Sequence, residues 1–358
     1  MIKHFFSQRS VQVGATILLS ALVFYIAFRS FSWTEFLAAI SRFDRRWLLP
    51  SIGLALIGYG VRALRWQVIL QPIQPVPLPF LFQATVLGYF VNLVLPVNIG
   101  ELVRAYLVKR EYAVSIFTVL GSYAVERVFG LIAFWLVGLF AVLTMAVPSD
   151  IAQVRQRVLL GMGAGLVLLV ALVLLVSWLR TNELRLGWLS QIGAAWMSPH
   201  WQIRLAGGWQ RFRQGLQFGG TPSATFLILF YSILLRVLSA LMMWSLAQGF
   251  GIGLPLLAYI FADVIVSVAH VAGSHLLGVV GSFEISLAYV LALFGASREI
   301  GLGMGLLMRA VYIFPLLVLG AIFFFTQGLS WADLQRLRQT AATDPDSSIV
   351  HLLPDLDR

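Results

Sequence analysis

Uncharged apolar runs long enough to cross a lipid bilayer recur along the whole chain. The cleanest cover residues 11–28, 128–147, 158–179 and 310–326, and residues 47–61 and 237–262 also lack Asp, Glu, Lys and Arg. A membrane-spanning helix needs roughly 20 such residues, and helices satisfy their own backbone hydrogen bonds inside hydrocarbon. The runs do not show the alternating pattern of barrel strands. The sequence therefore predicts an all-α, polytopic membrane helix bundle.

Composition supports this class and excludes others. Charged residues make up 11% of the chain and hydrophobic residues 59%, whereas a soluble domain carries about 25% charged residues. The net charge of +10 comes from basic residues scattered between apolar runs, so we interpret it as a topology signal and expect no nucleic-acid partner. The chain has no cysteine, which excludes disulfides, thiolate metal sites and cysteine nucleophiles.

Two apolar stretches are too broken to be simple crossings. Residues 66–100 are uncharged but contain five prolines, and the part after Phe80 ends in a break at Pro96. In residues 254–294, two short apolar pieces flank a glycine-containing break that ends at Gly281. Short, Gly- or Pro-interrupted segments at matching places in two halves point to the binding site of a transporter. We predict a re-entrant helical hairpin in each stretch, one opening to each side of the membrane.

The two halves of the chain match weakly. Glu101 precedes an Ala-Tyr pair at the same offset as Glu284 does, and Arg127 and Arg309 follow these glutamates at nearly equal spacing. A chance match in so biased a composition is the alternative. The interpretation we carry forward is two inverted repeats, each with two spans, a re-entrant hairpin and a final span.

This layout defines the domains. The transmembrane domain covers residues 1–328, with one repeat over about 11–147 and the other over about 158–327. The expected spans and hairpins are 11–31, 47–67, 80–110 and 115–147, then 158–179, 224–248, 254–294 and 301–327. Residues 180–222 carry Trp and Arg side chains that suit a helix in the headgroup plane, or they form only a linker. Residues 329–358 are polar and predicted to be a disordered cytoplasmic tail.

The charge distribution predicts the orientation. We expect a retained first helix rather than a cleaved signal segment, an inner (cytoplasmic) membrane location and both termini in the cytoplasm. Most basic residues then lie on the cytoplasmic side, as the positive-inside rule requires. That count includes Arg62, Arg65 and Arg104, whereas the cluster at 42–46 falls on the opposite side.

Ionisable groups within apolar runs are costly, so each is a candidate for function. The candidate substrate-binding set is Asn92, Asn98, Glu101, Arg104, Glu126, Arg127, Glu284 and Arg309. Arg236, Asp263, His270 and His275 also lie in such runs. A guanidinium group binds phosphate oxygens in a bidentate way, so a lipid phosphate is the expected partner. A permanent structural network of Arg and carboxylate side chains is the alternative.

These residues resemble a known family. The resemblance rests on Arg62 to Trp66, Asn92 to Pro96, Gly100-Glu101 with Arg104, Glu126-Arg127, Gly278 to Glu284, Arg309 and Pro315. The ordered set is similar to the lysylphosphatidylglycerol synthase transmembrane-region family, also called flippase-like integral membrane proteins, over roughly residues 10–327. Two positions depart from the family pattern: Asn98 stands where a basic residue is common, and Leu277-Gly278-Val279 where a Pro-Gly-Gly turn is common. These departures affect which substrate is expected.

The resemblance implies lipid translocation or lipid handling, and we expect neither a synthase nor a glycosyltransferase domain. The chain lacks His-x4-Asp, Gly-x-Ser-x-Gly and His-Glu-x-x-His patterns, so we expect no enzyme activity, no cofactor and no metal site. The favoured function is translocation of an anionic phospholipid or polyprenyl-phosphate-type headgroup, with membrane lipids as partners. The alternative is a scaffold or accessory subunit of a lipid or cell-envelope enzyme.

Overall fold

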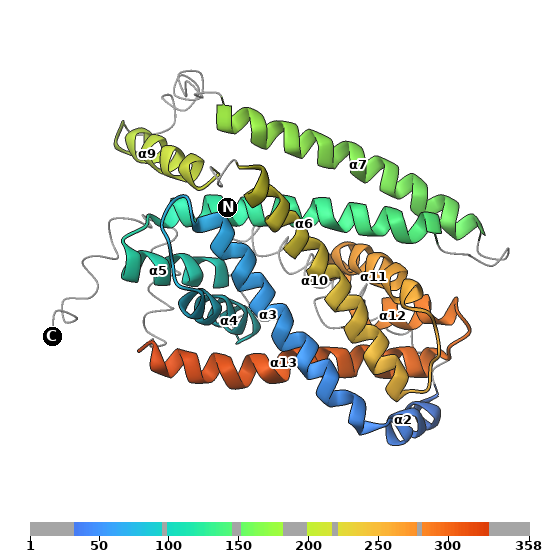
Figure 1. The fold of residues 1–358 in the computed structure, drawn as a ribbon. Helices are drawn as coiled ribbons and strands as arrows, with labels where there is room; N and C mark the ends of the chain where they lie inside the picture. The colour runs from blue at the N-terminus through green and yellow to red at the C-terminus, as the bar shows by residue number, and fades with distance from the viewer. Residues whose placement is uncertain are drawn as a thin grey trace, which may run out of the picture. The chain divides into compact units, whose positions relative to one another are not determined.

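The chain is helical throughout the part that the structure describes. The computed structural model describes residues 32–94, 99–144, 152–181, 199–216, 221–277 and 281–328. Over these residues it has eleven α-helices and no strand (Figure 1). Four helices are long and apolar enough to cross a membrane: Arg45–Leu70, Ile116–Thr144, Pro222–Gly249 and Arg298–Thr326. The predicted all-helical membrane fold is confirmed, whereas the expected first crossing and the polar tail lie outside the described residues.

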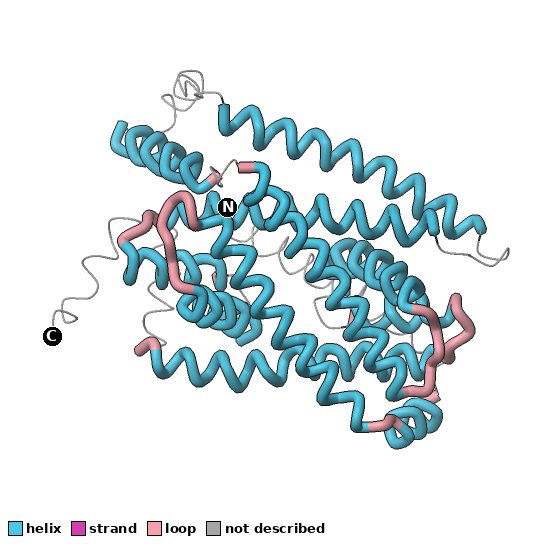
Figure 2. The backbone as a smooth tube through the Cα atoms, viewed as in Figure 1, coloured by secondary structure: helices cyan, strands magenta, loops and turns pink. Residues whose placement is uncertain are grey.

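The loops that the structure describes between helices are drawn in pink in Figure 2. The order of the helices is α2 (Trp33–Arg42), η1 (Arg45–Trp47), α3 (Leu48–Leu70), α4 (Leu78–Val94), α5 (Gly100–Tyr112), α6 (Ile116–Thr144), α7 (Ala152–Thr181), α9 (Pro199–Gly215), α10 (Pro222–Gly249), α11 (Leu256–Leu277), α12 (Ser282–Ala292) and α13 (Arg298–Thr326).

Helical hairpins form at both broken stretches. Helix α4 packs against α5, and α11 packs against α12. Helix α3 ends just before the prolines that separate it from α4, because proline lacks the N–H that continuation of a helix needs. Helix α5 ends where Ala113 adopts a left-handed conformation and donates its N–H to the Lys109 carbonyl oxygen at 3.0 Å. The two helix pairs appear where the sequence predicts hairpins, and their re-entrant placement in a membrane stays a prediction.

By its contacts the chain divides into two compact units, each holding one hairpin. The hairpin-1 unit comprises residues 56–137, 157–236 and 313–358, and the hairpin-2 unit comprises 1–55, 138–156 and 237–312. Long helices such as α3, α6, α10 and α13 contribute residues to both units. This partition differs from the two predicted repeats, which stay a prediction.

Each unit has its own apolar core. In the hairpin-1 unit, buried side chains from α3, α6, α10 and the residue after α9 meet: Ile69, Val125, Phe129, Leu216 and Ile228. In the hairpin-2 unit, the core around α10, α11, α12 and α13 includes Met243, Leu246, Tyr259, Leu287 and Met304.

Helix α2 was not expected from the sequence. Its start is fixed by the Ser32 side chain, which accepts the N–H of Glu35 at 3.3 Å.

Helix α9 forms within the polar segment 180–222, for which the sequence favours a helix in the headgroup plane or a linker. It lies against the start of α6 because both helices have a glycine at the crossing. A Cβ added to Gly121 would lie 2.8 Å from the Cα of Gly215, and the reverse substitution meets the same limit. This segment thus contains a helix over Pro199–Gly215, and its position in the headgroup plane stays a prediction.

Candidate functional site

In the first hairpin, two glycines and an asparagine bring α4 and α5 together. The N–H of Gly100, the first residue of α5, donates to Asn92 Oδ1 of α4 at 2.6 Å. A Cβ on Gly88 would lie 2.9 Å from the Gly100 carbonyl oxygen and 2.7 Å from Cγ of Arg104. Because glycine has no Cβ, the two backbones can approach and the Arg104 side chain can lie along α4. Asn92, a predicted site residue, therefore has its carbonyl oxygen engaged in holding the hairpin.

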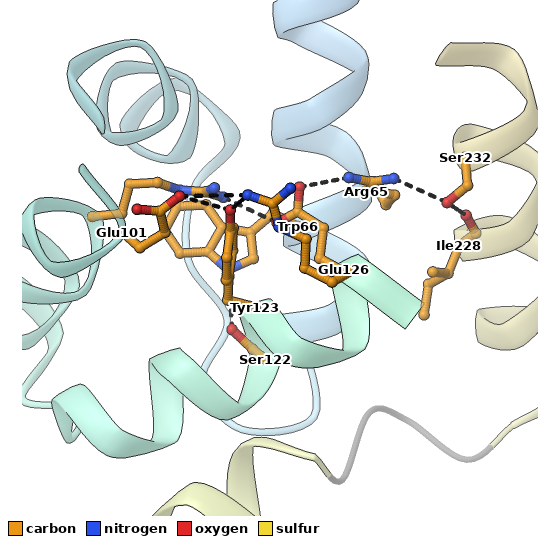
Figure 3. Close-up of polar contacts among 10 residues, drawn as sticks. Arg65, Trp66, Glu101, Ser122, Tyr123, Glu126, Ile228 and Ser232 are labelled. Atoms are coloured by element: carbon orange, nitrogen blue, oxygen red, sulfur yellow. Dashed lines mark hydrogen bonds and ion pairs between the residues drawn. The ribbon is translucent and has the colours of Figure 1, made fainter. Parts of the chain in front are cut away.

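A buried charged network joins this hairpin to three other helices of the hairpin-1 unit (Figure 3). Glu126 of α6 accepts from Arg65 of α3 at 2.5 Å and from Arg104 of α5 at 3.3 Å. Arg65 also donates to Ser232 of α10 at 3.0 Å. All four residues are buried. The network connects positions separated by up to 167 residues. Its contact with Glu126 orients the Arg104 side chain.

Aromatic rings hold the Arg104 guanidinium. Its Cζ atom lies 4.1 Å from the ring centroid of Trp66 and 5.5 Å from that of Tyr123. Trp66 is itself fixed by a 3.2 Å hydrogen bond from its indole N–H to Ser122, and Figure 3 shows Trp66 beside Glu126 and Tyr123. Cation–π contacts of this kind hold a charge without neutralising it. Among the described residues, Arg104 thus rests mainly on aromatic rings and has one longer contact to a carboxylate.

The buried network has more positive than negative charge. Two guanidinium groups share the single carboxylate of Glu126. The Nε atoms of Arg65 and Arg104 are buried and have no hydrogen-bond partner among the described residues. A buried donor without an acceptor costs about 1–3 kcal/mol. An anion with several acceptor oxygens would relieve both the excess charge and the unsatisfied donors.

A second ion pair lies nearer the surface of the same unit. Tyr123 donates to Glu101 Oε1 at 2.7 Å and accepts a hydrogen bond from Arg127. Arg127 also lies 3.5 Å from Glu101, and its side chain is 67% exposed whereas that of Glu101 is 21% exposed. The long contact and the exposure leave the Arg127 side chain able to reorient while it keeps its hydrogen bond to Tyr123.

The second hairpin has a corresponding ion pair. Glu284 of α12 accepts the N–H of Gly281 at 3.0 Å, which caps the start of the helix. Arg309 of α13 donates to both carboxylate oxygens, from Nε to Oε1 and from Nη2 to Oε2 at 3.1 Å. Gly281 has a φ of 105°, a conformation that residues with a Cβ rarely adopt. The chain therefore needs glycine here in order to present Glu284 at the start of α12.

The two ion pairs occupy matching places in their helices. Arg127 and Arg309 are each the twelfth residue of a 29-residue helix, counted from Ile116 and Arg298. Their partners Glu101 and Glu284 lie in the first turn of the second helix of each hairpin. Arg127 thus contacts Glu101, and Arg309 contacts Glu284. Equivalence through an inverted repeat stays a prediction.

We expect Gly305→Ala to destabilise the second hairpin. A Cβ at Gly305 would lie 2.9 Å from the Cα of Glu284, and because backbone cannot give way as a side chain can, the expected cost is about 1–3 kcal/mol. The measurement is the apparent unfolding temperature in detergent. The matched control is Gly303→Ala on the same helix, where the nearest atom is the flexible Cδ1 of Ile40 at 3.1 Å. Equal unfolding temperatures for the two variants would contradict the role assigned to Gly305.

The structure places the other predicted residues as follows. Asn98 lies outside the described residues, as do the side chains of His270 and His275. Asp263 is buried and accepts from Ser239 at 2.7 Å in the hairpin-2 unit. Four residues that take part in the contacts around Glu126 and Arg104 were not predicted as site residues: Arg65, Trp66, Tyr123 and Ser232. The Arg-x-x-Arg-Trp run of residues 62–66 was the available signal for two of them. Within the described ranges, no group of His, Asp and Glu side chains could hold a metal ion.

The fold and these networks define a class: an all-helical integral membrane protein with charged residues beside two helical hairpins. Comparison with protein families matches residues 13–320 to the lysylphosphatidylglycerol synthase TM region. The chain belongs to this family. Neither the search of curated proteins nor the search of solved structures found a match.

Proposed function

We propose that the chain translocates the headgroup of an anionic phospholipid or polyprenyl-phosphate-type lipid across the cytoplasmic membrane. The observation that carries the proposal is the buried network in which Arg65 and Arg104 share Glu126 and leave two N–H donors unsatisfied. A phosphate group supplies the missing negative charge and the missing acceptor oxygens. A neutral sugar supplies no charge.

Arg104 is better suited than Arg65 to meet the phosphate. Arg65 is held tightly, at 2.5 Å from Glu126 and 3.0 Å from Ser232. Arg104 has one contact to Glu126 at 3.3 Å and otherwise rests on aromatic rings. Exchanging this contact for a phosphate oxygen costs little, because the ring contacts can persist and Glu126 keeps Arg65. In this proposal Glu126 and Arg65 position the site, and Arg104 contacts the substrate.

The two ion pairs near the hairpins would act as holding contacts. Glu101 and Glu284 hold Arg127 and Arg309 when no headgroup is present, and protonation of either carboxylate would release its arginine. The lipid tails would remain in the bilayer, so only a small polar group needs shielding. The driving force would be an ion gradient, a lipid gradient or a partner protein. The proposal includes an inner-membrane location, cytoplasmic termini and no catalytic activity.

Transfer of fluorescent lipids in reconstituted vesicles tests this function. We expect wild-type protein to move anionic lipids faster than zwitterionic ones, measured by dithionite quenching of the outer leaflet. Arg127→Gln and Arg309→Gln should each abolish transfer of the anionic headgroup while the protein stays folded and monodisperse, because glutamine keeps the polarity and removes the charge. Transfer at the wild-type rate by both folded variants would contradict the proposed role of these arginines.

The second candidate function is a scaffold or accessory subunit for a lipid or cell-envelope enzyme. Its support is the closed contact of Arg309 with both oxygens of Glu284, which suits a permanent structural bridge. The same assay separates the two. A wild-type protein that moves no lipid under any gradient would sink the translocator proposal and favour the scaffold.

A further inference from the structure

An apolar groove of about 330 Å³ lies in the hairpin-1 unit, and none of its lining residues belongs to the charged network. It is formed by α3, α4 and the last part of α13. Its apolar lining consists of Gly60, Leu64, Leu78, Pro79, Phe82 and Phe323. Small-molecule sites in proteins begin at roughly 300 Å³, so the groove is large enough for part of a lipid chain and too small for a whole lipid.

The groove has one polar side chain in its lining, and that side chain leads to a charge. Gln83 lines the groove and accepts from Gln327 Nε2 at 2.7 Å. Gln327 in turn accepts from Arg110 twice, at 2.6 Å on its side-chain oxygen and at 3.1 Å on its backbone oxygen. A chain of two hydrogen bonds, through Gln327, therefore links the Arg110 guanidinium to Gln83 in the lining of the apolar groove.

Arg110 retains both charge and donors in this arrangement. Its two acceptors belong to a neutral residue, and no described carboxylate pairs with it. A guanidinium has five N–H donors, so three remain after these two bonds. A basic residue at the end of a helix also compensates the helix dipole, but that role does not require the contact with Gln327. An apolar trough joined to a cationic end matches the chemistry of a phospholipid, which has a chain and a phosphate.

We propose that this groove seats one acyl chain of an anionic phospholipid whose phosphate is bound by Arg110. The apolar lining selects the chain, and the uncompensated positive charge selects the anionic headgroup over a zwitterionic one. None of these residues belongs to the Arg65–Glu126–Arg104 network, so the inference does not depend on the proposed translocation. The bound lipid would stay with the protein rather than pass through it.

Filling the groove tests its apolar part. Gly60 lines the groove, and a Cβ added there meets no atom within 4 Å, so Gly60→Leu should occupy the trough without distorting the helix. Gly53→Leu is the matched control, because it lies on the same helix, also has open space and is not a groove residue. Native mass spectrometry of detergent-purified protein with added phosphatidylglycerol or phosphatidylcholine counts the retained lipids.

We expect wild type and Gly53→Leu to retain one phosphatidylglycerol at concentrations where phosphatidylcholine dissociates, and Gly60→Leu to lose it. Phe82→Ala, which removes one wall, should also weaken retention and serves if Gly60→Leu proves unstable. Arg110→Gln should lose the preference for phosphatidylglycerol by roughly 10-fold or more, the value of one charged hydrogen bond. Unchanged retention in both groove variants, or equal retention of the two lipids by wild type, would overturn the proposal.

Discussion

Glu126→Gln is expected to destabilise the protein more than any other single charge removal in the hairpin-1 unit. The substitution leaves Arg65 and Arg104 buried beside each other with no carboxylate between them. Breaking a buried ion pair by removing one partner costs about 3–5 kcal/mol, because the remaining charge is uncompensated. We expect a drop of several degrees in the apparent unfolding temperature in detergent, measured by intrinsic tryptophan fluorescence.

Two companion variants make this expectation specific. Glu101→Gln is the same chemical change, but its partner Arg127 is 67% exposed and also contacts Tyr123, so it keeps a partner and the effect should be smaller. The double variant Glu126→Gln/Arg104→Gln should be more stable than Glu126→Gln alone, since it removes one of the two repelling charges. A Glu126→Gln protein that unfolds at the wild-type temperature would show that Glu126 does not hold the network together.

Arg104→Gln is expected to slow lipid transfer strongly, with little effect on folding. Its removal leaves Glu126 paired with Arg65 at 2.5 Å, so the buried charges then balance. Loss of one charge-assisted contact to a phosphate is worth about 1.5–3 kcal/mol. The rate of anionic headgroup transfer in reconstituted vesicles should therefore fall by roughly 10- to 100-fold.

The controls for Arg104 separate charge from geometry. Arg104→Lys keeps the charge but loses the planar fork that rests on Trp66, so an intermediate rate is expected. Arg298→Gln removes an arginine that stacks on Tyr289 in the hairpin-2 unit, and its transfer rate should equal that of wild type. If Arg104→Gln is well folded and transfers lipid at the normal rate, the headgroup does not contact Arg104.

The helices were predictable because hydrophobic length and prolines specify them locally. The expected crossing at 47–67 appears as Leu48–Leu70, and the one at 224–248 appears as Pro222–Gly249. Hydrocarbon favours long uncharged helices whatever their neighbours are. The hairpin boundaries followed from the breaks in the apolar runs. Helix α2 was missed because a ten-residue amphipathic segment between two expected spans reads as a loop.

The network was only partly predictable, because it depends on contacts between distant segments. Glu126 and Arg127 were predicted as substrate-binding residues because their charges lie inside an apolar run. Arg104 was also a predicted site residue, but it was counted together with Arg65 among the cytoplasmic topology charges, and both side chains are buried. They cannot act as loop charges, so the predicted orientation rests on fewer residues than the sequence suggested. Ser232 carries no charge and nothing in its local sequence marks it, so only the packing of α10 against α3 reveals it.

The position of Arg127 and Arg309 along their helices sets a depth. The twelfth residue of a helix lies about 16 Å from its start, since each residue adds about 1.5 Å. The hydrocarbon core is about 30 Å thick, so a helix that begins at one boundary carries its arginine to the middle of the membrane. In the proposed translocation, a headgroup that reaches either arginine would have left its own leaflet without yet entering the other. The ion pairs would then lie at the middle of the membrane, where a phosphate is farthest from water. An arginine side chain at that depth would lower the free-energy barrier to crossing most.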